Sequence, residues 1–465
     1  MALIQVKYDS TIEQSDIIGT LYNTSPDESG DNYEKNYTDL QQTSIYGIQC
    51  PIIAVNNVMI GYDDILSFEL DDTKHIPTVS AHILDSRNII GMLNAPNNDN
   101  ELRVQILPPF DDVYKKINLT FIITSFSQGN ENDIFISGEY KLSSFVSSRF
   151  KSMGEQSIYS LFDTIASETK LGFATNVEDA DDKRFVYCPY ISYKTTIEKE
   201  IGHSGNETLI YDWWVDVWNY LNLVDIYERY NAIDNDDDMQ VWISNSKDEV
   251  SESIKQTPIK TKAELTNLFG SEESQLFVSN YRIINTPGLN VRSGTDKVYS
   301  VYKMNDNNYK DVYISDGDVK KDIYNNFEYK GEVYGDYDYI TNGMYRDIFL
   351  QKIKTNIVEV DLNQPLLGIQ RGNRVVFAWY FDDDYLNNLT RAMSEAGVYN
   401  DNAETNVPIE EIGDTPVGSF TLDKSVSGQY LVIGNVYSYS NKKWRHTVKL
   451  ARPADQNPKL IPVEE

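Results

Sequence analysis

The sequence predicts an α+β protein that is mainly β, in which two all-β regions flank a mixed module. The flanking regions, 44–150 and 355–453, contain short runs in which apolar and polar residues alternate. Such runs, separated by turn-forming residues, are typical of the strands of β-barrels and β-sandwiches. The intervening stretch, 151–245, mixes alternating runs with runs of helical spacing, which indicates a small α+β unit.

The length and charge of the chain limit the classes of function that it can have. The chain has 465 residues, with 41 Lys and Arg against 71 Asp and Glu, so its formal net charge is −30. This length predicts about three domains, each with its own core. Sequence-independent binding to nucleic acid depends on Lys and Arg, so the acid excess excludes nucleic-acid binding as the purpose of the chain. It also disfavours binding to anionic membranes, and its most ordinary role is to keep the protein soluble.

Targeting signals and disulfides are not expected. The first residues, MALIQVKYDS, do not resemble a signal peptide, and no uncharged apolar run reaches the roughly eighteen residues that a membrane helix needs. The two cysteines, Cys50 and Cys188, lie far apart in strand-like runs. They argue against a disulfide framework and suit synthesis in a reducing cytoplasm.

The first part of the chain divides into an arm and a β region. Residues 1–43 are predicted to form an acidic N-terminal arm, because positions 9–44 hold eight acidic side chains and one lysine. This composition is typical of an extended or loosely attached segment. From 44 to 150 six alternating runs follow: IYGIQCPIIAV, DILSFEL, TVSAHIL, ELRVQIL, INLTFIITSF and DIFISGEY. They predict six short strands.

A helix is predicted at the start of the mixed module. Ser152 and Glu155 have the spacing of a capping box, and Gly172 stands where a left-handed residue would end the helix. Apolar residues at helical spacing lie between them: Ile158, Leu161, Phe162 and Ile165. These positions predict one helix with a single buried face.

A second, Trp-rich helix is predicted between 210 and 221. Its apolar residues repeat at intervals typical of a helix: Ile210, Trp213, Trp214, Val217, Trp218 and Leu221. The face that they share is interpreted as a buried core stripe rather than as a ligand platform. Two strands are predicted to follow, LVDIYERY and MQVWISN, joined by the polar loop NAIDNDDD.

Three further segments are defined by their composition. The region 246–354 is predicted to be irregular or β, and ten tyrosines lie between Tyr299 and Tyr345. Tyrosine is common in strands and at interfaces, so both interpretations stay open, and a docking surface is slightly favoured. Residues 381–417 hold nine acids and one arginine and are interpreted as an acidic insertion, and 454–465 form a C-terminal tail.

The second β region, 355–453, ends in a predicted hairpin around Asn441 and Lys442. Its earlier strands are IVEVDLNQPLLGI and RVVFAWYF, and the hairpin strands are QYLVIGNVYSYS and KWRHTVKLAR. Alternation in the last strand places four side chains on one face: Trp444, His446, Val448 and Leu450. His446 is therefore interpreted as a packed or edge histidine rather than as a ligand or base.

No catalytic, cofactor-binding or metal-binding residue is predicted. The chain has four histidines: His75, His82, His203 and His446. None belongs to a zinc motif, and no phosphate-binding or dinucleotide-binding motif occurs. Ser204 lacks the second glycine of a nucleophile elbow, because Asn206 stands in its place. The acidic loop from Asp234 has Met239 and Asn245 where a calcium loop needs glycine and glutamate.

Two stretches resemble the baseplate hub (tail hub) proteins of bacteriophages, a family related to late control protein D and VgrG-type hubs. The first is LGFATNVEDADDKRFVYCPYISYKTTIEKEI, followed by DWWVDVWNYLNLVDIYERY. Its matching residues are Leu171, Gly172, Phe173, Thr175, Asn176, Pro189, Trp214, Asp216, Leu221 and Asp225. Where the family has a tryptophan before the proline, this chain has Phe185 and Tyr187. The ending resembles the last hairpin of these hubs at Ser427, Gly428, Tyr430, Val432, Gly434, Val436, Leu450 and Arg452.

The resemblance implies a structural protein of the virion without catalysis. Hubs of this kind have two tail-tube-like β domains joined by an intervening module, and three copies close a ring that adapts a sixfold tail tube to a threefold spike. The implied partners are the other copies of a homotrimer, tail tube proteins, the central spike protein and other baseplate proteins. Assembly in the host bacterial cytoplasm is implied, and DNA would cross the lumen on ejection without specific binding, repelled by the acidic chain.

Two other classes of function stay open from the residues alone. A tail-associated peptidoglycan hydrolase would use two of the 71 acidic side chains as acid and base. A carbohydrate-binding adhesin would use the Tyr-rich segment 299–345 and the β regions.

Overall fold

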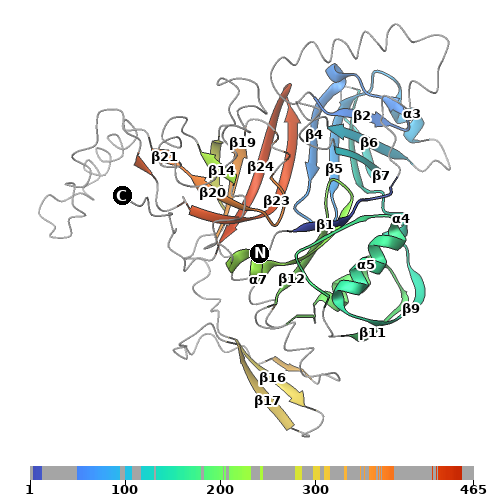
Figure 1. Cartoon of the computed structure of the whole chain (residues 1–465). Coiled ribbons are helices and arrows are strands. Elements are labelled where there is room, and N and C mark those ends of the chain that lie inside the picture. Colours follow the sequence, from blue (N-terminus) through green and yellow to red (C-terminus); the bar gives the residue numbers. More distant parts are fainter. Residues whose placement is uncertain are drawn as a thin grey trace, which may run out of the picture.

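Figure 1 shows the fold as a computed structural model. The structure describes residues 4–12, 50–94, 100–106, 117–129, 132–179, 183–202, 204–205, 209–231, 241–244, 278–284, 297–303, 308–314, 329–331, 346, 350, 356–362, 365, 367, 369–381, 421–422, 426 and 428–452. The acidic loop that begins at Asp234 lies outside these residues up to position 240. Most of the predicted arm, the acidic insertion beyond Phe381 and the C-terminal tail lie outside them too.

One large, mostly antiparallel sheet organises the fold. Within the described residues it has thirteen strands, in the order β15-β19-β24-β23-β4-β5-β8-β7-β6-β2-β3, with β20 beside β23 and β14 beside β20. The first β region contributes β2 (Ile52–Val55), β3 (Val58–Met59), β4 (Ile65–Asp71), β5 (Thr78–Leu84), β6 (Glu101–Ile106), β7 (Ile117–Gln128) and β8 (Asp133–Tyr140). Two short helices, η1 (Tyr62–Asp64) and α3 (Ile89–Leu93), lie between these strands in the sequence.

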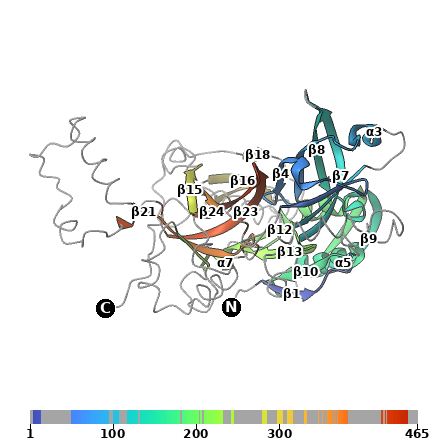
Figure 2. The ribbon, with the colours of Figure 1, turned by 90° about the horizontal axis from the view of Figure 1, so that it is seen from above.

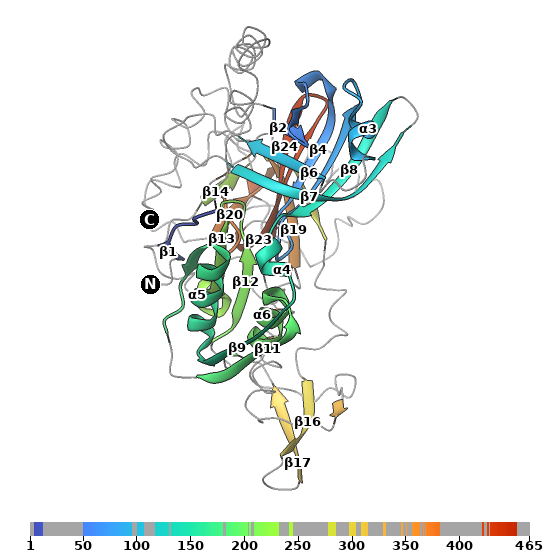
Figure 3. The ribbon, with the colours of Figure 1, turned by 90° about the vertical axis from the view of Figure 1, so that its right-hand side faces the viewer.

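The rest of the sheet comes from later in the chain. Its strands are β14 (Val241–Ser244), β15 (Val278–Ile283), β19 (Asn356–Leu362), β20 (Arg374–Ala378), β23 (Gly428–Ser440) and β24 (Lys443–Arg452). Two short strands, β21 (Tyr380–Phe381) and β22 (Thr421–Leu422), pair with each other. Figures 1 and 3 show that the sheet is strongly curled.

A direct strand pair joins the two β regions. β4 pairs antiparallel with β23, so that Asp71 lies opposite Val436 and Ser67 lies opposite Ser440. This pairing satisfies backbone groups that two separate sheets would leave open at their edges. The long hairpin β23–β24 turns at Asn441 and Lys442, as predicted, and both residues have the left-handed backbone that a two-residue hairpin turn requires.

The predicted alternation is clear in β8. Ile134, Ile136 and Tyr140 are buried, whereas the intervening Phe135 and Glu139 are exposed. The buried residues belong to the main hydrophobic core together with the inward side chains of β4, β5, β6 and β7. One face of this part of the sheet therefore packs on the core and the other carries exposed side chains.

The mixed module has a second sheet. It runs β1-β10-β13-β12, from β1 (Gln5–Tyr8), β10 (Gly172–Thr175), β12 (Tyr211–Val215) and β13 (Tyr220–Asp225). Strand β1 belongs to the predicted N-terminal arm, so positions 5–8 of that arm are paired rather than loose. Helix α5 (Ile158–Thr169) packs on β10 and β13 and contacts α6 (Tyr193–Ile201). A separate two-stranded ribbon, β9 (Arg149–Gln156) with β11 (Arg184–Ile191), follows the short helix α4 (Ser143–Val146).

The first predicted helix is confirmed as α5, but its predicted ends are wrong. Ser157 caps it, since its Oγ accepts a hydrogen bond from the backbone N–H of Ser160 at 3.0 Å, and the Ser160 Oγ in turn accepts from the Ser157 N–H. Ser152 and Glu155 lie in β9 instead. The left-handed residue is Lys170, with a φ of 64°, and Gly172 begins β10. Because β9 stays extended to Gln156, the helix can begin only after it, and Ser157 is the polar residue that caps it.

The predicted Trp-rich helix is wrong, because its residues form the hairpin β12–β13. Every residue of both strands is buried, so apolar side chains point to both faces and their spacing along the chain also contains a helical repeat. Trp213 packs into the main core, and Trp214 packs into a separate cluster on the other face. The Asp216 carboxylate fixes the turn by accepting hydrogen bonds from the N–H groups of Trp218 at 2.9 Å and Tyr220 at 3.0 Å.

Two further strand predictions need correction. Of LVDIYERY, only the first residues lie in β13, and α7 (Ile226–Asn231) contains the rest. The Asp225 carboxylate accepts hydrogen bonds from the N–H groups of Tyr227 and Glu228 and so caps the start of this helix. MQVWISN does form β14, but β14 pairs in parallel with β20 instead of forming a hairpin with the preceding strand.

The Tyr-rich region forms a small sheet of its own. Within the described residues, β16 (Lys297–Lys303) pairs with β17 (Asn308–Ile314) and with β18 (Tyr329–Gly331). Figures 1 and 3 show this sheet standing apart from the two larger ones. The fold class is α+β and mainly β, as the sequence predicts.

Candidate functional site

A buried polar joint connects the large sheet to the mixed module. It forms where the turn between β4 and β5, the hairpin β12–β13 and the turn before β20 meet. Asp72, Asp212, Asp216 and Arg371 are each less than a tenth exposed there. Buried charges are costly unless they are paired, so their arrangement decides how firmly the parts are held.

Arg371 is the centre of the joint. Its Nη2 donates to the Asp212 Oδ2 at 3.0 Å, and its Nη1 donates to the Lys74 carbonyl at 3.0 Å. The guanidinium lies over the Trp214 ring, 4.8 Å from its centroid. Because these contacts come from the β4–β5 turn and from β12, one side chain links the large sheet to the module. The planar guanidinium, with donors in fixed directions, suits this bridging role.

Two more arginines extend the joint. The Arg346 Nη2 lies 3.8 Å from the Asp212 Oδ1, and its Nε donates to the Tyr211 carbonyl at 3.0 Å. The Arg229 Nε donates to the Gly372 carbonyl at 2.9 Å, which ties α7 to the turn before β20. Gly372 has a φ of 83°, and an added Cβ would lie 3.0 Å from the Trp214 ring, so the turn depends on glycine here.

His75 connects the β4–β5 turn to β12 directly. Its carbonyl accepts the Val215 N–H at 2.8 Å, and its Nδ1 donates to the Trp213 carbonyl at 2.6 Å. The imidazole is stacked on the Trp213 ring at 4.6 Å. Burial is the main effect on the pKa of His75 and lowers it, which keeps the ring neutral at pH 7. This histidine is therefore a packing and hydrogen-bonding residue.

Asp72 is the least well satisfied acid of the joint. Its Oδ1 has no hydrogen-bond partner among the described residues. Burial, followed by the nearby Asp216 carboxylate, raises the pKa of Asp72 well above its ordinary value, although Arg371 opposes this. Burial is also the largest cause of the raised pKa of the Tyr437 hydroxyl, and the charges of Asp72 and Asp216 raise it further. Ionised Asp72 is thus a cost to the folded state.

We expect Asp72→Asn to raise the melting temperature by a few degrees at pH 8. A pKa that is raised on folding contributes stability below the unfolded pKa and loses it as the pH rises through the folded pKa. The gain of the variant over the parent should therefore shrink as the pH is lowered from 8 to 4. Thermal unfolding followed by circular dichroism across this range measures it. If the difference in stability between Asp72→Asn and the parent protein were the same at every pH, the pKa of Asp72 would not be raised in the folded protein.

His446 is a packed histidine, as predicted. It is fully buried, stacked on the Tyr437 ring at 4.5 Å, and its Nε2 lies 3.1 Å from the Asn435 Oδ1. Burial lowers the pKa of His446 to about 3. Trp444, Val448 and Leu450 of the same face are buried with it.

The other sequence candidates are not brought together. Ser204 is buried and its hydroxyl donates to the Glu200 carbonyl at 2.7 Å, while His203 and Asn206 lie outside the described residues. In the described part of the chain, no three His, Cys, Asp or Glu side chains are grouped as a metal ion would need. No helix in that part is long and apolar enough to cross a membrane.

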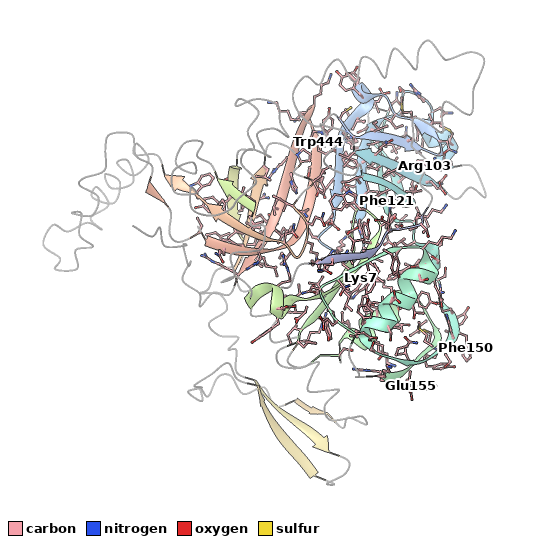
Figure 4. All side chains as sticks on the ribbon, viewed as in Figure 1. Lys7, Arg103, Phe121, Phe150, Glu155 and Trp444 are labelled. Atoms are coloured by element: carbon pink, nitrogen blue, oxygen red, sulfur yellow. The ribbon has the colours of Figure 1, made fainter. Side chains whose placement is uncertain are left out.

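Sequence reasoning missed two features of the surface and the joint. One is the joint itself, whose residues carry no motif and in which the contact between Lys74 and Arg371 spans 297 positions. The other is the ribbon β9–β11, which exposes Phe150, Phe185, Tyr187 and Tyr190. Figure 4 shows Phe150 at the outer margin of the module. The aromatic residues around Pro189 were a visible signal, but alternation does not show which face is open to solvent.

Comparisons with known proteins identify the fold. No protein-family model matches the sequence, and no curated protein sequence matches it. The tail protein from Neisseria meningitidis MC58 is similar over 90% of this chain and 99% of its own, with a TM-score of 0.50 and 10% identity.

Other solved structures are similar at lower TM-scores. The 43 kDa tail protein of prophage MuSo2 from Shewanella oneidensis covers 87% of this chain and 98% of its own, with a TM-score of 0.48 and 9% identity. A Francisella PdpA-VgrG complex covers 97% of this chain and 65% of its own, with a TM-score of 0.45 and 8% identity. The Neisseria meningitidis tail protein is of the kind that the sequence resemblance indicated. The similarity to the Neisseria meningitidis protein spans nearly the whole of both chains. This chain therefore has the mainly β fold of that tail protein.

Proposed function

We propose that this chain is the structural hub of a phage tail baseplate, and that three copies form a ring between the sixfold tail tube and the threefold spike. The observation that carries the proposal is the pairing of β4 with β23, which makes one sheet from two β regions far apart in the sequence. One chain then supplies two tube-like segments in a fixed relation. Three such chains would offer six segments to the tube while keeping threefold symmetry for the spike.

The buried joint supports a mechanical role. A ring under load needs its parts held at constant angles, and the joint fixes the module to the sheet through Arg371, His75 and the backbone of β12. No catalytic step is proposed. The partners are the tail tube proteins, the spike protein and other baseplate proteins, and the protein resides in the virion tail after assembly in the host cytoplasm.

The net charge supports passage of DNA through the ring. Each copy carries a formal charge of −30, so three copies carry −90. Contacts from Lys and Arg to phosphate would retard the duplex, and an acid excess disfavours them. The excess is greatest in 9–44 and 381–417, outside the stretches that resemble the hub family, and this weakens the support that the net charge gives.

Electron microscopy of the purified chain mixed with the spike protein tests the proposal. We expect class averages with threefold symmetry and an open centre, and a sixfold outline on the side that meets the tube. Particles without rotational symmetry in the presence of the spike would contradict the proposal.

A further inference from the structure

The ribbon β9–β11 has one buried and one exposed face. Val186 and Cys188 of β11 are buried, and the ribbon packs on α5 and α6. The other face carries Phe150, exposed by 73%, and Phe185, exposed by 71%. With Tyr187 and Tyr190 these residues form a surface that we call the aromatic ribbon face. Four exposed rings on one two-stranded ribbon exceed the scattered apolar residues of an ordinary surface.

Tyr190 is held in a strained backbone conformation. Its φ is 60°, at a point where the register between β11 and β9 shifts between Pro189 and Ile191. The left-handed region is unfavourable for a bulky residue with a Cβ. The Tyr190 ring at this bulge is 74% exposed. A strained position whose side chain remains mostly exposed in its own chain points to a contact with another molecule.

We propose that the aromatic ribbon face is the contact that one copy of this chain makes with the next copy in the ring. The inference rests on the proposed ring and adds the surface that closes it. The contact is head-to-tail, because the same face of one copy meets a different surface of its neighbour, as a closed ring requires.

The charge of the ribbon strands favours a second copy of this chain as the molecule that binds the aromatic ribbon face. Two copies that carry −30 each repel overall, so a contact between them is favoured where acidic side chains are scarce. The two ribbon strands hold Arg149, Lys151 and Arg184 but a single acid, Glu155, so their balance is opposite to that of the chain. Lys151 is paired with Glu168, which leaves the ribbon close to neutral. A basic partner would prefer the acidic surfaces elsewhere, whereas another acidic copy favours this one.

The size of the surface is adequate for part of such an interface. At about 150–250 Å² per aromatic side chain, four rings exposed to this extent would bury on the order of 500 Å². A stable interface needs about 800 Å² from each partner, so the rings would form its apolar centre and the polar residues around them its rim. Figure 2 shows β9 on the opposite side of the molecule from the edge strand β15.

The test combines Phe185→Ser with Tyr190→Gly and measures the mass of the chain in the presence of the spike protein. We expect the double variant to weaken the trimer by at least about tenfold, as the loss of central aromatic residues does at other interfaces. The melting temperature of its monomer should not fall, because glycine relieves the left-handed backbone. The matched control is Phe135→Ser, since Phe135 is also exposed but lies on β8. The control should remain a trimer.

The outcomes separate this inference from the proposed function. A parent protein that stays monomeric with the spike overturns the ring and this surface together. A parent and a double variant that both form trimers of equal strength overturn the surface and leave the ring standing. A photo-crosslinking residue at position 185 gives a second readout: covalent dimers of the chain support the proposal, and crosslinks to the spike in their place contradict it.

Discussion

Arg371→Ala is expected to lower the free energy of unfolding by about 3–5 kcal/mol, since removal of one partner leaves the other charge of a buried pair with much less compensation. The Asp212 carboxylate would lose its contact at 3.0 Å and keep Arg346 at the longer distance of 3.8 Å. The Lys74 carbonyl and the Trp214 ring would lose their contacts as well. Thermal or urea unfolding followed by circular dichroism measures the change.

Arg282→Ala is the matched control for Arg371. The Arg282 Nη2 lies 2.9 Å from the Glu359 Oε2, but its side chain is 49% exposed. An exposed ion pair is screened by water and contributes about 1 kcal/mol or less. Equal losses from the two substitutions would show that the joint is not the link that we infer.

Trp213→Ala should destabilise the protein by about 3–5 kcal/mol, as truncation of a large buried aromatic side chain does. Trp213 is almost fully buried, stacked on His75 at 4.6 Å and close to Phe145, whose ring centroid is 5.9 Å away. The substitution would open a cavity where β12, α4 and the β4–β5 turn meet. Unfolding by urea, followed by circular dichroism, gives the size of the effect.

Phe150→Ala is the control for this truncation. It removes an aromatic ring of similar kind that is 73% exposed in the single chain, so little buried area is lost there. The free energy of unfolding of the monomer, measured without the spike protein, should therefore change by less than about 0.5 kcal/mol. If Trp213→Ala were as mild as Phe150→Ala, the packing of the module against the sheet would have to be reconsidered.

Strands with one buried face were predictable from the sequence. The runs DILSFEL and DIFISGEY alternate, and they form β4 and β8 at the predicted positions. The hairpin at Asn441 and Lys442 followed from local turn chemistry. These features depend on neighbouring residues, which a sequence displays directly.

The Trp-rich segment shows where this reasoning fails. Trp213 and Trp214 are adjacent, so in a helix they share a broad face and in a strand they point to opposite faces. Because β12 is buried on both faces, its apolar residues have no period of two, and their spacing fits a helix equally well. The deciding fact is tertiary: β12 lies between two hydrophobic clusters.

The joint could not be predicted for a related reason. Arg371 and Asp212 are 159 positions apart, and nothing near either residue indicates the other. The pairing of β4 with β23 is also a long-range event, with Asp71 opposite Val436. Local propensity does not determine which of several strands pair, and burial of a charge depends on the whole fold.

The mass of the assembled chain distinguishes a ring of three copies from a single copy. One copy has a mass of 53.3 kDa, so a ring of three copies should have a mass of about 160 kDa. Native mass spectrometry or light scattering, with and without the spike protein, measures it. We predict a trimer, at least when the spike is present. A strict monomer of 53.3 kDa under both conditions would contradict the account.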